Sequence, residues 1–401
     1  MPIRGFTRRR LLRHTTLLPL AAALPRVAVA QSAPLRLGVL TPLTGAGGFD
    51  GPRMLKAMQA VADELNGAGG LLKRQISLVV EDTQTNPDDA VRAAHKLIDV
   101  ERVPVIMGTW ASAVTTAVLP LCWESKTFLC TVSGADSITL MPHQGYLIRT
   151  QPNNKLQATA HAEFILSLGI KRIFLMSIQA PFAEPTRNYL DTSLRAAGGG
   201  LTGSLIYEKD KTSYRAEVDE ALKTKPELVY LNGYAPDVAV LLRDLYQAGY
   251  DGPRFTQSYA LTTKSLSELP AEVTEGCYTA QPSADVNSPA YARAVARLHA
   301  TEIDSYESQA TDWISLVSLA IARAGEATGT AIRDHVKNIT RVGAPVVYTA
   351  VDGMKPIADG KDVKYEGASG PCEFNEIGDI TKCRFRFMKV EGGKFKFLKV
   401  A

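Results

Sequence analysis

The sequence lacks the residue patterns that usually carry metal, redox or hydrolytic chemistry. Its 401 residues include five cysteines, none before Cys122 and no two spaced as C-x-x-C. The six histidines stand at no zinc-binding spacing, and no G-x-S-x-G turn presents a nucleophilic serine. These histidines are His14, His95, His143, His161, His299 and His335. The common zinc, dithiol and serine-hydrolase sites are thereby excluded, so we expect neither an enzyme nor a cofactor.

Long apolar runs are also missing. A bilayer-spanning helix needs about 20 apolar residues, and the apolar stretch 17–24 is far shorter. The pair Arg8-Arg9 precedes it, and the small residues 28–30 follow it. This order is typical of a twin-arginine export signal, residues 1–30, whereas a basic tail before a short strand explains only the arginines. We expect cleavage after Ala30 and a periplasmic protein without a membrane anchor.

Little net charge remains once this segment is set aside. Residues 1–30 hold six arginines and no acidic residue, so the formal charge changes from +4 for the whole chain to −2 for residues 31–401. Such a balance gives no electrostatic reason to expect nucleic acid as a partner.

The cysteines allow disulfides without forming a dense scaffold. Cys372 and Cys383 flank a turn-like segment whose two arms are able to bring them together, and Cys122 and Cys130 form a second candidate pair. Unpaired structural roles explain both pairs as well. Cys277 lies in an apolar run and is expected to be a packing residue.

Short apolar strands alternate with helical patterns twice along the chain. The first series has strands at 35–40, 76–80, 103–107 and 128–131, and the second starts near residue 153 and reaches residue 248. Continuous apolar strands followed by amphipathic helices predict parallel sheets covered on both faces. The fold class expected is therefore α/β, with two doubly wound parallel-sheet lobes.

The last third of the chain completes these lobes. About 370 residues are too many for one core, but strands 385–390 and 394–400 are too few for a third domain. The chain must then cross between the lobes several times. We predict one lobe from 31–150 plus 282–378 and another from 151–281 plus 379–401.

A ligand site is expected where the strands of both lobes end. Ser112 follows the glycine turn that carries Trp110, and we expect both residues to contact the ligand. Ser112 stands at a helix N-cap position, where a hydroxyl and backbone N–H groups receive a carboxylate. Ser112 acting only as a cap is the alternative. The glycine-rich turn 45–51 departs from dinucleotide-binding spacing and is expected to be either a ligand-contacting loop with Phe49 at its tip or a plain turn.

At these residues the chain resembles the branched-chain amino-acid binding proteins that serve ABC importers. The resemblance covers nearly all of residues 31–401 and depends on the order of individually weak motifs. They are Gly38-Val39-Leu40-Thr41-Pro42-Leu43-Thr44-Gly45, Glu81-Asp82, Asn86-Pro87, Leu147-Ile148-Arg149-Thr150, Gly233-Tyr234-Ala235-Pro236, Gly370-Pro371 and Phe374-Asn375-Glu376. The resemblance implies two α/β lobes joined by three hinge strands, which close on a ligand.

The resemblance also implies roles for individual residues. Its carboxylate-binding serine falls on Ser112, and its cleft tyrosine falls on Tyr234. The backbone-contact segment and the aromatic contacts fall on Ser133, Ala135, Phe49 and Phe182.

Two departures bear on the ligand. Ala135 replaces a threonine, and Tyr259 replaces the acid that pairs with the ammonium of an amino acid. A buried ammonium without an anion costs several kcal/mol, which disfavours an ordinary amino acid unless Asp136 or another carboxylate substitutes. A carboxylate with an apolar or aromatic body, or an amide-like solute, then fits as well as leucine.

We therefore expect a monomeric solute-binding protein that delivers a small molecule to ABC permease subunits. A sensor subunit for a signalling receptor is the alternative with the same fold. An exported enzyme is the alternative from another class.

The export prediction is tested by replacing Arg8 and Arg9 with lysine. This change keeps the charge but removes the guanidinium pair that the export receptor reads, so the precursor is expected to stay in the cytoplasm. Arg4→Lys is the matched control and is expected to leave export intact. Cell fractionation and N-terminal mass analysis give the result, and a mature periplasmic protein that still begins at Met1 contradicts it.

Overall fold

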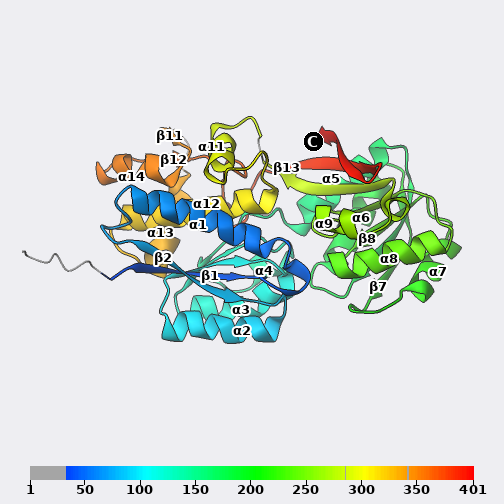
Figure 1. Ribbon diagram of the computed structural model, residues 1–401, viewed down its shortest axis with the longest axis horizontal. Coiled ribbons are helices and arrows are strands. Elements are labelled where there is room, and N and C mark those ends of the chain that lie inside the picture. Colours follow the sequence, from blue (N-terminus) through cyan, green and yellow to red (C-terminus); the bar gives the residue numbers. More distant parts are fainter. Residues whose placement is uncertain (1–32, 285, 341–342) are drawn as a thin grey trace, which may run out of the picture. The chain divides into compact units, whose positions relative to one another are not determined.

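The computed structural model describes residues 33–284, 286–340 and 343–401. The predicted signal at residues 1–30 lies outside them. Two large sheets, each covered by helices, dominate the described chain (Figure 1), and a small two-stranded sheet, β11-β12, is added to them. The predicted α/β class with parallel-sheet lobes is confirmed. Among the described residues, no helix combines the length and apolar character needed to cross a membrane.

The first sheet has five parallel strands in the order β2-β1-β3-β4-β5. Its central strand β3 is buried at every residue, as expected for a parallel strand between two helical layers. The strands are β1 (Leu35–Thr41), β2 (Ile76–Asp82), β3 (Val105–Thr109), β4 (Phe128–Thr131) and β5 (Leu147–Arg149). Helices α1 (Gly51–Gly67) and α12 (Ser305–Ala324) pack together on one face, and α2 (Pro87–His95) and α3 (Ser112–Glu124) on the other (Figure 1).

The second sheet has seven strands in the order β14-β13-β10-β9-β8-β6-β7. Strand β13 pairs antiparallel with β10, β14 pairs antiparallel with β13, and the other pairs are parallel. The strands are β6 (Arg172–Ile178), β7 (Gly200–Tyr207), β8 (Leu228–Asn232), β9 (Arg254–Gln257), β10 (Cys277–Ser283), β13 (Arg384–Glu391) and β14 (Lys394–Val400). Its paired helices are α5 (Asn154–Ser167) with α6 (Ala183–Ala196), and α7 (Arg215–Lys223) with α8 (Ala235–Gln247).

Caps and breakers set the ends of the helices. Asp304 and Glu307 form a capping box at the start of α12, and Gly325 ends the helix with a φ of 73°. The remaining helices are α4 (Ser137–Leu140), α9 (Thr263–Glu268), α10 (Ala271–Thr274), α11 (Pro289–Arg297), α13 (Gly329–His335) and α14 (Ala350–Ala358). The short elements are η1 (Gly45–Gly47), η2 (Lys96–Val100), η3 (Val336–Ile339), β11 (Val346–Val347) and β12 (Lys364–Tyr365).

The chain passes three times between the two sheets. It leaves the first sheet after β5, returns after β10 and leaves again before β13. A buried ion pair links two of these passages: Arg149 Nε and Nη2 each donate to the Asp379 carboxylate at 2.8 Å. Arg149 also donates to the Ala135 carbonyl at 2.6 Å and to the Thr139 hydroxyl at 3.1 Å. Its guanidinium is therefore fully occupied in a site closed to water.

Cys372 and Cys383, the first candidate disulfide pair, are both free, so of the two alternatives the structure has the unpaired one. The two arms do pair through a hydrogen bond in which the Thr381 N–H donates to the Glu373 carbonyl at 3.0 Å. However, Cys372 has a φ of 48°, and its Sγ lies 3.5 Å from Asp312. Cys383 Sγ contacts its neighbour's carbonyl instead. Cys122 and Cys130, the second candidate pair, are also free, and so is Cys277, which is buried as expected for a packing residue.

Removing one partner of the ion pair tests how much the hinge depends on it. Asp379→Ala leaves the buried Arg149 guanidinium without its anion, so the free energy of unfolding is expected to fall by about 3–5 kcal/mol. Glu373→Ala is the control, because it breaks an exposed pair with Lys382, and its expected cost is below about 1 kcal/mol. Urea unfolding measures both, and equal costs contradict the prediction.

Candidate functional site

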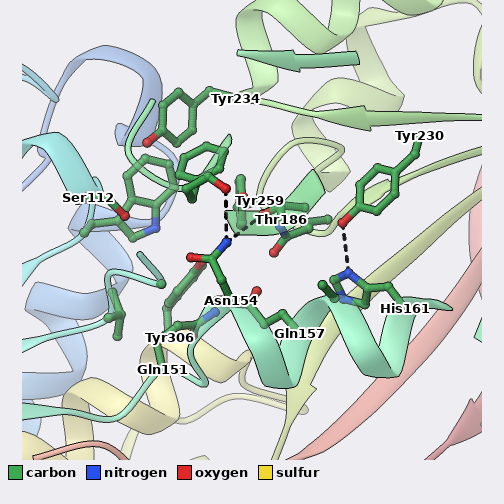
Figure 2. A pocket seen from close by; sticks show the side chains of 16 residues that line it. Ser112, Gln151, Asn154, Gln157, His161, Thr186, Tyr230, Tyr234, Tyr259 and Tyr306 are labelled. Atoms are coloured by element: carbon green, nitrogen blue, oxygen red, sulfur yellow. Dashed lines mark hydrogen bonds between the residues drawn. The ribbon is translucent and has the colours of Figure 1, made fainter. Parts of the chain in front are cut away.

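A small enclosed cavity lies where the strands of both sheets end. Its volume is about 40 Å³, and Figure 2 shows side chains entering it from both sheets. One set of lining residues follows β3 and β4 or starts α12, and the other lies on α5, α6, β8 and the turns after β8 and β9. The lining consists of Trp110, Ser112, Val132, Gly134, Gln151, Asn154, Gln157, Ala158, His161, Phe182, Thr186, Tyr230, Tyr234, Gln257, Tyr259 and Tyr306.

Aromatic rings form one wall of this central cavity. The Trp110 ring centroid lies 5.1 Å from that of Tyr234, 5.6 Å from that of Tyr259 and 6.3 Å from that of Tyr306. Phe182 packs edge-on against Tyr234 at 6.0 Å. Cavities that hold a benzene-sized molecule measure roughly 150 Å³, so these rings must move apart before a ligand of that size enters.

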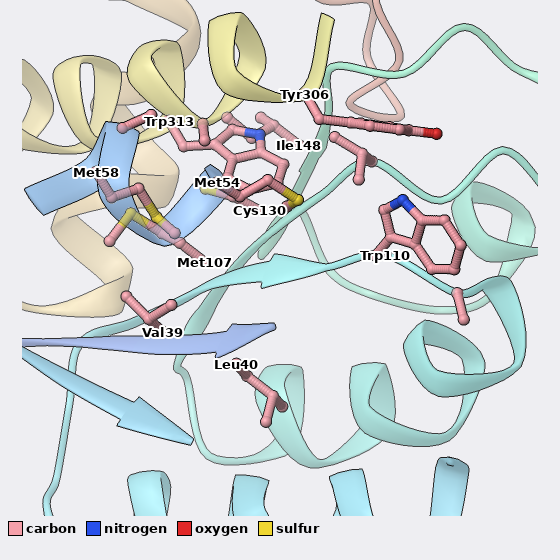
Figure 3. Close-up of a cluster of buried hydrophobic side chains, with 14 of the residues drawn as sticks. Val39, Leu40, Met54, Met58, Met107, Trp110, Cys130, Ile148, Tyr306 and Trp313 are labelled. Atoms are coloured by element: carbon pink, nitrogen blue, oxygen red, sulfur yellow. The ribbon is translucent and has the colours of Figure 1, made fainter. Parts of the chain in front are cut away.

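Trp110 and Tyr306 continue into the hydrophobic core around the first sheet. Figure 3 shows both at the end of a buried cluster that includes Met54, Met107 and Trp313. The Trp110 Nε1–H interacts with the Tyr306 phenol without reaching hydrogen-bonding geometry. The indole therefore retains a buried donor for a ligand.

The start of α5 supplies the opposite, polar side. Asn153 caps this helix by accepting from the Leu156 N–H at 3.1 Å. The Asn154 amide then donates to the Thr186 hydroxyl at 2.6 Å and to the Phe182 carbonyl at 3.2 Å (Figure 2). Asn154 Oδ1 is buried and has no partner among the described residues. An unsatisfied buried acceptor costs about 1–3 kcal/mol, which a donor on a ligand removes.

The prediction that Ser112 is a helix N-cap is off by one residue. Helix α3 begins at Ser112, and Ala111 takes the cap position with extended backbone and no capping side chain. The Ser112 hydroxyl instead accepts from the Ala135 N–H at 3.3 Å. Because no side chain caps α3, its first N–H groups are open to an anion at the cavity.

The structure brings five of the eight predicted ligand contacts together at the cavity. They are Trp110, Ser112, Phe182, Tyr234 and Tyr259.

Three predicted contacts lie elsewhere. The Ser133 hydroxyl is used within the protein, donating to the Trp110 carbonyl at 2.9 Å and meeting the Thr115 hydroxyl at 2.6 Å. Ala135 lies behind Ser112 with both backbone groups bonded. The Arg53 guanidinium lies over the Phe49 ring, with Arg53 Cζ 5.2 Å from the ring centroid. Phe49 lines another cavity.

The central cavity is lined entirely by uncharged side chains. None of its lining residues is Asp, Glu, Lys or Arg. Burial lowers the pKa of His161 to about 3 and raises the pKa of Tyr234, so both are neutral at pH 7. Asp136, the suggested substitute for the missing acid, accepts from the Asn154 N–H at 2.9 Å and does not line the cavity. In the described chain, no group of side chains is arranged to hold a metal ion.

The polar face of α5 is the part of the site that sequence reasoning missed. Asn154, Gln157 and His161 follow one another at intervals of three and four residues, which places them on one face of a helix. A buried helix face normally carries apolar residues. The polar stripe was therefore a readable signal, whereas Tyr306 and Tyr230 gave none.

Comparison with known proteins agrees with this geometry. A family model described as periplasmic binding protein matches residues 34–394. The Leu/Ile/Val-binding protein BraC3 of Rhizobium johnstonii is 24% identical over 373 residues, which cover 90% of this chain and 93% of that protein. The solved leucine-binding protein LivK from Thermotoga maritima matches with a TM-score of 0.78 at 22% identity, over 91% of this chain and 98% of that chain. A solute-binding protein of an ABC transporter from R. palustris, in complex with benzoate, matches with a TM-score of 0.75 at 18% identity, over 92% of this chain and 96% of that chain.

The neutral state of His161 predicts how stability changes with pH. Its folded pKa of about 3 lies below the unfolded value of about 6.5, so below that value the unfolded chain binds a proton that the folded chain rejects. As the pH falls from about 6 to about 4, His161 should therefore lower the free energy of unfolding by roughly 1 kcal/mol per pH unit. Urea unfolding at several pH values should show a flatter profile for His161→Gln. His95→Gln, at an exposed position, is the control, and identical slopes in all three proteins contradict the prediction.

Proposed function

The chain belongs to the periplasmic binding protein family, and from this premise we propose that it binds a small carboxylate whose remaining part is uncharged and delivers it to an ABC importer. The observation that carries the ligand class is the central cavity, which offers an uncapped helix start and buried donors but no charged side chain. An anion is favoured at such a helix end. A second charge of either sign has no counter-ion there.

The carboxylate is held at the start of α3. The Ser112 hydroxyl and the first N–H groups of the helix supply donors, and the Trp110 indole N–H is a further buried donor. Charge-assisted hydrogen bonds of this kind are stronger than neutral ones. They explain how an anion is bound without an arginine or lysine.

The rest of the ligand lies between aromatic rings and the amides of α5. Tyr234, Tyr259 and Phe182 give apolar contact area, and Asn154 Oδ1 accepts from one polar group of the ligand. Benzoate, the ligand named for the R. palustris protein, has such an apolar body with one carboxylate. Leucine, named for the Thermotoga maritima protein, adds an ammonium, which costs several kcal/mol to bury without an anion.

Closure over the ligand follows from the hinge and the size of the cavity. We infer that residues 31–150 with 282–378 move as one lobe, and residues 151–281 with 379–401 as the other. A cavity of about 40 Å³ between packed rings corresponds to a closed clamp. A ligand that contacts both lobes binds this state best and shifts the population towards it.

Export to the periplasm places the protein where such a carrier works. The twin arginines at Arg8 and Arg9 support the twin-arginine route, with the mature chain starting at Gln31. The protein then acts as a monomer that meets the permease subunits of the importer.

A pair of matched ligands tests the proposed ligand class. Leucine and 4-methylpentanoate share the carboxylate and the branched chain and differ only in the ammonium. Calorimetry is expected to give wild-type affinity for 4-methylpentanoate at least about tenfold above that for leucine, because the ammonium finds no anion. Tyr259→Glu supplies one at the cavity wall and is expected to reverse the order.

Ser112→Ala is the control for this experiment. Both ligands present a carboxylate to Ser112, so its loss is expected to weaken both by about 1–3 kcal/mol and leave their ratio unchanged. Tighter binding of leucine by the wild type, together with an unchanged ratio in Tyr259→Glu, rules out the proposed ligand class.

A further inference from the structure

A second and larger cavity lies on the other side of Tyr259 and Tyr306. Its volume is about 440 Å³, and these two tyrosines line both cavities. Its remaining walls come from the starts of α1 and α12, the turn after β9, and strands β10, β13 and β14. The helices that cover the first sheet and the strands of the second sheet therefore both line it.

Asp50 is a buried carboxylate in the wall of this cavity. The residue is 4% exposed, and its carboxylate has no hydrogen bond or ion pair within the described chain. It stands at the cap position of α1, but its own backbone is helical, with φ −88° and ψ −40°. Pro52, in the first turn, has no N–H to offer. Asp50 therefore does not cap the helix.

The other charged side chains at this cavity already have partners. Arg53 lies one turn along the helix from Asp50 but pairs with Asp304 and Glu307, at 2.7 Å each. Arg386 pairs with Glu302. Among the residues that line this cavity the acids outnumber the cations, and Asp50 is the acid that forms no ion pair. Burial, followed by the charge of Asp304, raises the pKa of the Asp50 carboxyl, and the charge of Arg53 offsets this only in part.

The neighbouring side chains favour an organic cation over a metal ion. No arrangement of His, Cys, Asp and Glu in the described residues is suited to hold a metal. Ile303, Met388 and Phe395 give the cavity apolar walls beside Asp50. The Phe49 ring is already covered by the Arg53 guanidinium, so it does not offer an open aromatic face to a quaternary ammonium. A cation with N–H donors, which a carboxylate accepts hydrogen bonds from, therefore suits this site better.

We propose that this cavity is a binding site for a primary ammonium group carried on an apolar chain, with Asp50 as its counter-ion. The ammonium donates hydrogen bonds to the Asp50 carboxylate, and the chain packs against Ile303, Met388 and Phe395. The site is separate from the carboxylate site at α3 and does not depend on the ligand proposed for it.

Pentylammonium and pentan-1-ol, which have the same chain, are the probes for this site. Calorimetry on the full-length mature protein is expected to detect pentylammonium binding, and Asp50→Asn is expected to weaken it roughly tenfold or more by removing the charge-assisted hydrogen bonds. Pentan-1-ol is expected to bind more weakly and equally to both proteins. Binding of pentylammonium by the wild type that Asp50→Asn leaves unchanged overturns the proposal, as does its absence by calorimetry and ligand-observed NMR.

Two controls separate the role of the Asp50 charge from a general charge effect and from an effect on folding. Glu302→Gln removes the same charge from the same cavity, but from a residue already paired with Arg386, so a loss as large as that of Asp50→Asn overturns the role of Asp50. Binding of 4-methylpentanoate by Asp50→Asn shows that this variant is folded. If 4-methylpentanoate binds neither protein, thermal unfolding of the variant gives the folding control, and the pentylammonium result still decides this site.

Discussion

The buried ion pair between Arg149 and Asp379 fixes the frame in which the ligand site is built. It joins the end of β5, where the chain first leaves the first sheet, to the segment where the chain leaves it for the last time. The same guanidinium binds the carbonyl of Ala135, and the Ala135 N–H binds the Ser112 hydroxyl. A charge buried at the hinge is thereby connected, through three hydrogen-bonded residues, to the helix start that faces the central cavity. Each hydrogen bond of the guanidinium offsets part of the free energy that burying its charge costs. A segment that shifted alone would lose such a bond and leave the buried charge less well paired.

The two cavities differ in the charge of the side chains that line them. The central cavity keeps every lining side chain neutral, and it does so partly by burial, which lowers the pKa of His161 to about 3. An anionic ligand in this cavity depends on helix N–H groups and hydroxyls for its hydrogen bonds. The electrostatic attraction between these groups and the anion becomes stronger when water is excluded. The neighbouring cavity holds the unpaired Asp50 behind Tyr259 and Tyr306. Those two rings separate a site suited to an anion from a site suited to a cation.

The aromatic rings at the central cavity pack on one another across the two sides of the site. Trp110 contacts rings that belong to the other sheet, so the rings pack on one another when no ligand separates them. Aromatic pairs of this kind contribute about 0.5–1.5 kcal/mol each beyond their buried area. A ligand must replace those contacts with its own, which favours bodies that are apolar and flat or branched.

The sequence by itself determined the alternation of strands and helices, the two sheets and the polar turn at Ser112, because strand burial and helix periodicity are local patterns that need no knowledge of distant contacts. The resemblance to the amino-acid binding proteins, also carried by the sequence, implied that Tyr259 stands where those proteins have an acid. The tertiary structure decided which of these residues meet. Ser133 and Ala135 follow β4 as expected, but their polar groups are used by Thr115, Trp110, Ser112 and Arg149. Cys372 turns towards Asp312 instead of Cys383, and Asp50 does not cap α1 because its backbone is helical and Pro52 follows. Each of these outcomes depends on contacts between segments far apart in the chain, and such contacts leave no periodic pattern in the sequence.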